Sequence, residues 1–170
     1  STVFTNDDAV MSVNFADGRI KGYPTQEPGS GNDNEYYAMI VSGNPQYGQN
    51  DFQDNNDGTI TDHATDLMWT QQDSSEKMNW REALAYVLTK NEENYLGHSD
   101  WRLANAKELQ SLVEYSLSPD NDGTPAIDPV FDLIAQDITA QDYNDSDDPD
   151  FGYHWTSTTL VEVLSDGSER

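Results

Sequence analysis

The sequence predicts an α+β domain, and three patterns along its 170 residues lead to that fold class. Short apolar runs lie between Asp-Gly turns, which is typical of strands joined by tight connections. Two stretches carry apolar residues at helical spacing, and each begins at an asparagine suited to capping a helix. A long acidic stretch, 117–152, follows the second helix and is predicted to be a loop region. We expect all of 1–170 to form a single domain.

The charge and composition exclude several classes of protein. Asp and Glu number 32 against 8 Lys and Arg, which gives a formal net charge of -24. Phosphate binding needs clustered basic side chains, so neither nucleic acid nor an anionic membrane surface is an expected partner. No stretch approaches the roughly 20 apolar residues that span a bilayer. There is no cysteine, which excludes a disulfide framework and a thiolate metal site.

Four short runs in the first 70 residues are predicted to be strands. Residues 10–15 and 38–41 are apolar runs among long loops rich in Gly, Pro, Asn and Asp. Residues 59–62 alternate in polarity, and the apolar run 67–69 follows. The dipeptide Thr65-Asp66 lies between these two runs, so we expect a hairpin with its turn there.

Two helices are predicted from capping boxes. Asn79 precedes Glu82 by three residues, and Asn105 precedes Glu108 by the same spacing. In this pattern the asparagine and glutamate side chains satisfy backbone N–H groups of the first turn. The apolar positions that follow at helical spacing are Trp80, Ala83, Leu84, Val87 and Leu88 in the first helix, and Leu109, Leu112 and Val113 in the second.

The last part of the chain is predicted to be extended. Residues 153–159 alternate with β-branched and aromatic side chains, and a final strand is expected at 160–164. Arg102 is one of few cations, and we expect it to pair with a buried carboxylate in a structural role. The four tryptophans, expected to lie mainly in the core, are Trp69, Trp80, Trp101 and Trp155.

Five blocks of sequence occur in one order along the chain: DNNDGTITDHATDLMW from 54, NWREALA from 79, SDWRLANAKELQSLV from 99, AIDPVF from 126 and YHWTSTT from 153. These blocks resemble the Lcl C-terminal-domain-like family, a bacterial family of unknown function, and the likeness runs from about 15 to 159. The resemblance implies a C-type-lectin-like fold, with a twisted antiparallel sheet, two flanking helices and long loops that carry binding. It also implies a secreted or cell-surface location.

Two departures from the family's pattern bear on this expectation. Ala104 stands where the family usually has proline, which makes the entry to the second helix less rigid. Similar proteins also continue with further strands after the Trp-Thr-Ser-Thr-Thr run, whereas this sequence ends at Arg170. A sheet without its last strands has an open edge, and a strand added from another chain is one way to complete it.

Clustered acidic residues predict calcium as a structural cofactor, because Ca²⁺ prefers carboxylate, amide and carbonyl oxygens. A true EF-hand does not fit, since with Gly58 in the glycine position Ala64 stands where the bidentate Glu belongs. The alternative is that these residues form turns and solvated loops. The three histidines lack zinc-ligand spacing. The candidate ligands are Asp54, Asn56, Asp57 and Asp62, then Asp120 and Asp122, then Asp142, Asp145, Asp147, Asp148 and Asp150.

Three classes of function are compared on this basis. The leading hypothesis is a secreted or surface-exposed, non-catalytic adhesion module that binds a glycan or a protein, with Ca²⁺ ordering its loops. The alternative is a self-associating subunit of an extracellular fibre or lattice, assembled by strand addition. An enzyme ranks last, because no nucleophile, metal triad or phosphate loop stands out.

Overall fold

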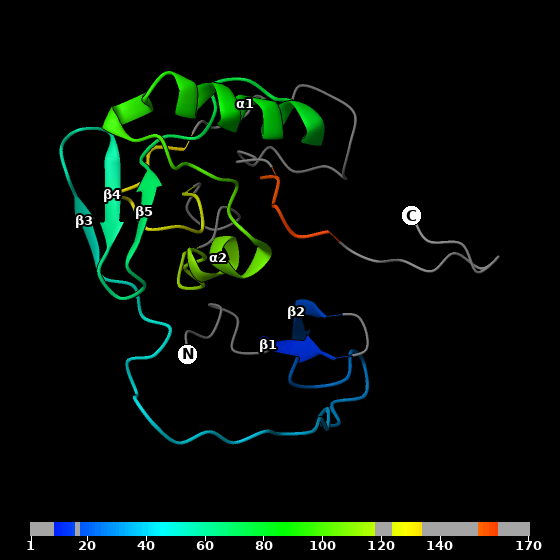
Figure 1. Cartoon of the computed structure of the whole chain (residues 1–170). Helices are drawn as coiled ribbons and strands as arrows, with labels where there is room; N and C mark the ends of the chain where they lie inside the picture. Colours follow the sequence, from blue (N-terminus) through cyan, green and yellow to red (C-terminus); the bar gives the residue numbers. More distant parts are fainter. Residues whose placement is uncertain (1–8, 16–17, 118–123, 134–152, 160–170) are drawn as a thin grey trace.

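The computed structural model describes residues 9–15, 18–117, 124–133 and 153–159 (Figure 1). This part of the chain confirms the α+β class, with two antiparallel sheets and two α-helices. The elements are β1 (Ala9–Asn14), β2 (Arg19–Pro24), β3 (Phe52–Asp54), β4 (Thr59–Asp62), β5 (Leu67–Thr70), α1 (Trp80–Glu92), the 3-10 helix η1 (Tyr95–Gly97) and α2 (Ala106–Ser111).

The larger sheet has the order β3-β4-β5, with both pairs antiparallel. The predicted hairpin is confirmed: β4 and β5 pair with Ile60 opposite Trp69. The turn passes through Asp66 at a φ of 58°, a left-handed conformation that Asp tolerates better than most residues. As the central strand, β4 is the most deeply buried, and Ile60 has no exposed surface.

The smaller sheet consists only of the hairpin β1–β2, which pairs Met11 with Gly22. The strand predicted at 10–15 is therefore confirmed, displaced by one residue toward the N-terminus. Val10 and Val13 are about half exposed. In Figure 1 this hairpin lies below α2 and apart from the larger sheet.

Both helices begin where the capping boxes predict. Asn79 caps α1 and Asn105 caps α2, and in each box the third-position glutamate accepts the backbone N–H of the cap residue. The helix α1 lies along the top of the molecule in Figure 1, and α2 lies near its centre. None of the helices among the described residues has the length and apolar character to cross a membrane.

The hydrophobic core lies between the larger sheet, the end of α2 and 126–131. The rings of Phe52 and Phe131 meet edge to face, with their centres 5.1 Å apart, a favourable aromatic geometry. The buried core residues are Ile60, Leu112 and Phe131, and those packed around them are Phe52, Trp69, Leu109, Ile127 and Val130.

Two predicted strands are wrong. Residues 38–41 are not in a strand, and no other described strand lies alongside to supply the hydrogen bonds that a strand needs. Residues 153–159 are not in a strand either, because their backbone groups bond to the starts of helices instead. The strand predicted at 160–164 lies outside the described residues.

The tryptophan prediction needs a similar correction. Trp69, Trp80 and Trp101 are partly buried, but the side chain of Trp155 is 52% exposed. Its indole N–H is nonetheless bonded within the protein, as the polar edge of a partly exposed tryptophan allows.

Candidate functional site

Residues 155–158, hereafter the clasp, join the N-terminal ends of the two helices. On the α1 side, the indole Nε1 of Trp155 donates to the carbonyl oxygen of Met78 at 2.8 Å. In return, the indole Nε1 of Trp80 donates to the carbonyl oxygen of Thr156 at 3.0 Å. Two reciprocal indole bonds therefore hold the clasp against the first residue of α1 and the chain before it.

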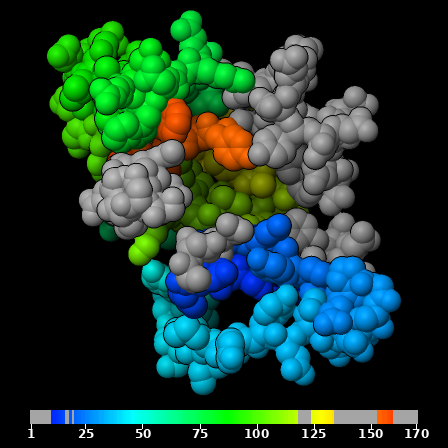
Figure 2. Space-filling model, turned by 90° about the vertical axis from the view of Figure 1, so that its right-hand side faces the viewer, coloured from blue at the N-terminus to red at the C-terminus, as the bar shows by residue number. Residues whose placement is uncertain are grey.

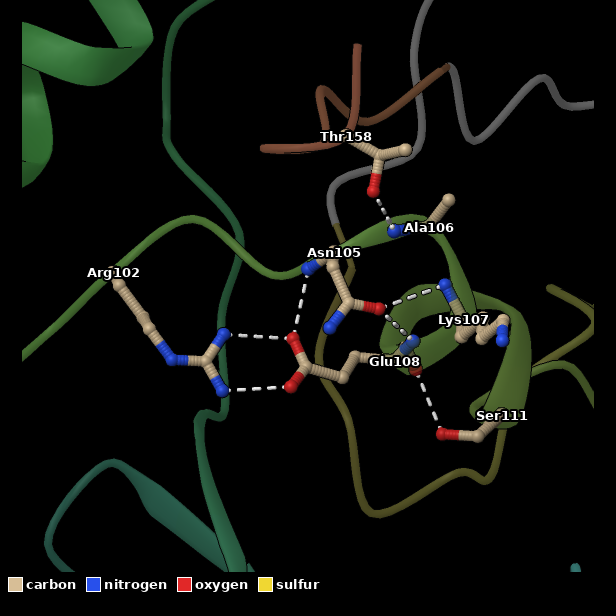
Figure 3. A network of polar contacts seen from close by, with 7 residues as sticks. All are labelled: Arg102, Asn105, Ala106, Lys107, Glu108, Ser111 and Thr158. Carbon is tan, nitrogen blue, oxygen red and sulfur yellow. Dashed lines mark hydrogen bonds and ion pairs between the residues drawn. The ribbon is translucent and has the colours of Figure 1, made fainter. Parts of the chain in front are cut away.

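On the α2 side, the clasp satisfies backbone groups that the helix itself leaves open. The Ser157 N–H donates to the carbonyl oxygen of Ala104 at 2.9 Å. The Ala106 N–H donates to the hydroxyl oxygen of Thr158 at 3.0 Å (Figure 3). The first N–H groups of a helix have no partner within it, so Thr158 supplies one from a distant part of the chain.

Arg102 is bonded to Glu108 in the same network (Figure 3). The two terminal guanidinium nitrogens, Nη1 and Nη2, each donate to one carboxylate oxygen of Glu108 at 2.7 Å, and the Asn105 N–H also donates to Glu108. The Arg102 bonds hold the pKa of Glu108 below its ordinary value and raise that of Arg102. The predicted ion pair is confirmed, but Arg102 is 58% exposed and the Glu108 side chain 18%. A pair this open to solvent contributes about 1 kcal/mol, less than the buried pair expected from the sequence.

The predicted calcium ligand Asp62 is an acceptor of internal hydrogen bonds. Its side chain is 1% exposed and accepts from the backbone N–H groups of Asp51 and Ala64, from the amide of Asn50 and from the hydroxyl of Thr65. Burial acts to raise the pKa of Asp62, but the four bonds outweigh it and the pKa is lowered. Both carboxylate oxygens thus stabilise the approach to β3 and the β4–β5 turn.

The other three ligand candidates in this region shape the β3–β4 turn. The Asp57 carboxylate accepts from the N–H of Thr59 at 3.0 Å and from its hydroxyl at 2.6 Å, and the hydroxyl bond is the main reason that the pKa of Asp57 is lowered. The Asp54 carboxylate accepts the N–H of Asn56 at 2.7 Å, and Asn56 is left-handed with a φ of 58°. Side chains that bond the backbone two residues on are characteristic of Asx-turns.

The predicted metal clusters are only partly covered by the structure. Throughout the described ranges, no group of three or more His, Asp or Glu side chains is arranged to hold a metal ion. The other predicted ligands lie outside these ranges, namely Asp120, Asp122, Asp142, Asp145, Asp147, Asp148 and Asp150.

Sequence reasoning missed an aromatic surface beside the clasp. Tyr153 is 99% exposed and lies two residues before Trp155. Between them, His154 lies 3.5 Å from the carboxylate of Asp73. The signal available in the sequence is the alternation of aromatic residues at 153 and 155, from which we predicted an extended run with Trp155 in the core.

An apolar pocket of about 290 Å³ lies next to the core. In Figure 2, residues 124–133 (yellow) lie at the floor of a hollow between 153–159 (orange) and the β1–β2 hairpin (blue). Two groups with acid or hydroxyl chemistry, Asp132 and Thr124, line the pocket. Its other lining residues are Leu117, Pro125, Ile127, Pro129, Phe131 and Leu133.

The comparisons with known proteins identify one family. The family model described as the Lcl C-terminal domain matches residues 58–167, more than half of the chain. The matched range begins at the β3–β4 turn and includes both helices, the core residues after them and the clasp. No curated protein matches the chain. No solved structure matches it either. Because one continuous match covers both helices, the clasp and more than half of the sequence, the chain belongs to the Lcl C-terminal domain family.

Proposed function

We propose that this chain is a non-catalytic binding and adhesion module with a C-type-lectin-like fold, secreted or displayed on a bacterial surface, whose ligand is a glycan or a protein. The single observation that carries the proposal is the fixed, half-exposed indole ring of Trp155. The family membership and the antiparallel sheet with two helices support the lectin-like fold.

The arrangement of Trp155 suits recognition because its position is fixed before a ligand arrives. Its N–H is bonded to the carbonyl oxygen of Met78, so the ring cannot swing freely, and about half of the residue's surface is open to a ligand. Tyr153 adds a second aromatic side chain close by. Rigid aromatic side chains bury a large area on binding at a low cost in conformational entropy, which is why they dominate recognition surfaces.

The use of the described carboxylates supports binding rather than catalysis. Asp57, Asp62 and Glu108 are held ionised by hydrogen bonds within turns and caps, as their lowered pKa values indicate. A general acid or base instead needs a pKa near the working pH. These carboxylates therefore act as parts of the scaffold.

The test is to screen the chain against an array of neutral oligosaccharides and a panel of extracellular proteins, and then to measure the affinity of the strongest hit for variants. Tyr153→Ala should weaken binding about tenfold, which corresponds to roughly 1.4 kcal/mol. Tyr47→Ala is the matched control, because that tyrosine is also almost fully exposed but lies in a different segment. Equal affinities for the Tyr153→Ala and Tyr47→Ala variants would show that the ligand does not bind beside the clasp.

A second candidate function is a subunit of an extracellular fibre or lattice assembled by strand addition. One observation favours it: the side chains at 39–41 are almost entirely exposed, although they are apolar and suited to a strand. An exposed segment of this kind is a template for pairing with another chain.

We also propose that Ca²⁺ binds through the acidic stretch 142–150 rather than through the turns at 54–62. Five carboxylates within 142–150 repel one another unless a cation offsets their charge. In the turns, the oxygens of Asp57 and Asp62 already accept hydrogen bonds. Carboxylate oxygens are ligands that Ca²⁺ prefers.

A further inference from the structure

We propose that residues 36–42 pair with the same residues of a second copy of this chain, as two antiparallel strands related by a two-fold axis. This segment, Tyr-Tyr-Ala-Met-Ile-Val-Ser, is hereafter the pairing segment. The inference starts from the same exposed segment as the second candidate function but predicts a closed two-fold pair in place of a growing fibre, and it is independent of ligand binding at the clasp.

The pairing segment lies in the connection between β2 and β3, which Figure 1 shows running along the outside of the molecule. Hydrogen bonds hold the connection on either side of it: the Asn34 N–H donates to the carbonyl oxygen of Thr25, and the Tyr47 N–H donates to that of Asn44. In the described structure, the backbone groups of 35–43 form no hydrogen bond. A stretch of unpaired donors and acceptors is what an added strand requires.

The side chains of the pairing segment are exposed in both alternating sets. Tyr37, Met39 and Val41 form one set, and Tyr36 and Ile40 belong to the other; Ile40 is 98% exposed. Among the described residues, the segment makes one ring contact, between Tyr36 and Tyr23, with centres 5.9 Å apart. Monomeric proteins rarely expose a contiguous apolar run of this kind, and it marks an interaction surface.

The distribution of charge indicates a second copy as the partner. The chain carries a net charge of -24, so two copies repel one another over most of their surfaces. The fifteen positions from 36 to 50 contain no charged residue. Like-charge repulsion is therefore weakest here, and this stretch is where two copies can approach most closely.

The sequence of the segment is also complementary to itself. If the two-fold axis passes through Met39, antiparallel pairing places Tyr37 opposite Val41 and Ala38 opposite Ile40. Aromatic residues opposite β-branched ones are favourable cross-strand pairs, and Ala38 leaves room for its larger partner. In the same register the nearest carboxylate, Glu35, lies opposite Gly43, so no two like charges face each other across the pair.

Sedimentation velocity of the 170-residue chain over a range of concentrations and NaCl tests the proposal. The expected result is an equilibrium between the 19.1 kDa monomer and a dimer of twice that mass. Added salt should strengthen the dimer, because it screens repulsion between acidic copies. A basic protein partner would show the opposite salt dependence.

Charge substitutions at the axis make the test specific. Met39→Lys should weaken dimerisation at least about tenfold, since like charges directly opposite one another destabilise a strand pair. Met39→Glu should do the same, and an equimolar mixture of the two variants should dimerise again. Gln49→Lys is the control, because it adds the same charge at an exposed position in the uncharged stretch but outside the segment. The Met39 side chain is 85% exposed, so the substitutions should leave the melting temperature unchanged.

Three results would overturn the two-fold pairing. A monomer at every concentration and salt would remove both the pairing and strand addition between copies. Growth beyond the dimer would support a fibre and contradict a closed pair. A dimer that persists in Met39→Lys alone would place the interface elsewhere. In each case, the dependence of glycan or protein binding on Tyr153 is measured in a separate experiment, so these results do not test the leading function.

Discussion

Asp62 illustrates how a single carboxylate can hold two connections of a sheet together. Its two oxygens accept four hydrogen bonds from chain segments on both sides of β4, and its side chain is buried. Two of the four donors are the backbone N–H groups of Asp51 and Ala64, so the carboxylate holds the main chain of both segments directly. Asp62 therefore fixes both the entry to β3 and the β4–β5 turn.

We predict that Asp62→Ala lowers the free energy of unfolding by about 2–3 kcal/mol, because it leaves several donors without an acceptor. Urea denaturation followed by circular dichroism measures the loss. Asp54→Ala is the comparison, since Asp54 is exposed and accepts one short bond and one long bond; its cost should stay below about 1 kcal/mol. A loss for Asp62→Ala no larger than that of the control would contradict this role.

At the scale of elements, the sequence predicted what local signals specify. The capping boxes at Asn79 and Asn105 fixed both helix starts, because each box is complete within four residues. The β4–β5 hairpin was also predictable, since its two strands are neighbours in sequence. Residues 153–159 show what a sequence pattern does not predict. Alternating side-chain types indicate an extended backbone, but they do not indicate whether that backbone will bond to a neighbouring strand or to the ends of helices.

The hydroxyl of Thr158 is the predicted stabiliser of the start of α2. We expect Thr158→Val to destabilise the protein by about 1 kcal/mol, as for other lost helix caps, because the Ala106 N–H loses its acceptor while the side-chain shape is kept. Chemical denaturation measures the change. The matched control is Thr159→Val, the same substitution one residue later at an exposed position. Equal stability of the two variants would show that solvent replaces the Thr158 bond at no cost.

At the scale of the whole molecule, charge decides how stability depends on pH. The net charge of -24 destabilises the compact state by self-repulsion, so stability should rise as the pH falls from 7 toward about 5. Below that range the trend should reverse. The carboxylate of Glu114 accepts hydrogen bonds from the hydroxyl and the N–H of Ser116, which lower its pKa, and the pKa values of Asp62 and Glu108 are lowered as well. The contribution of these three groups is present above their ordinary pKa values of 3.8 or 4.5 and is lost as the pH falls through the lower folded-state values.

Urea denaturation across this pH range, at low and high salt, measures the rise in stability toward about pH 5 and the fall below it, which we call the acid limb. High salt should reduce the rise, because it screens exposed charges. It should change the acid limb less, because that limb arises from short hydrogen bonds. The Asp62→Asn variant should show a shallower acid limb than the parent. A monotonic increase in stability down to about pH 3 would contradict the assignment of these carboxylates as structural.

Calcium also belongs to this scale, because it changes the charge balance of the whole chain. We predict that the melting temperature rises with added Ca²⁺ and falls with a chelator, since a ligand that binds only the folded state stabilises it. The double variant Asp145→Asn, Asp147→Asn should lose this response, whereas Asp54→Asn should keep it. The same response in all three proteins would place any calcium site elsewhere.

The clasp has a consequence for the order in which the molecule assembles. Its bonds to Met78 and Trp80 link positions 77 and 76 residues apart in sequence. Contacts between such distant positions form late, because the chain between them must first be ordered. On the ribosome, the bonds that join the two helix starts can therefore form only after residues 155–158 have emerged. A nascent or trimmed polypeptide that stops short of residue 155 would have to keep its two helices in place without the connection that joins them.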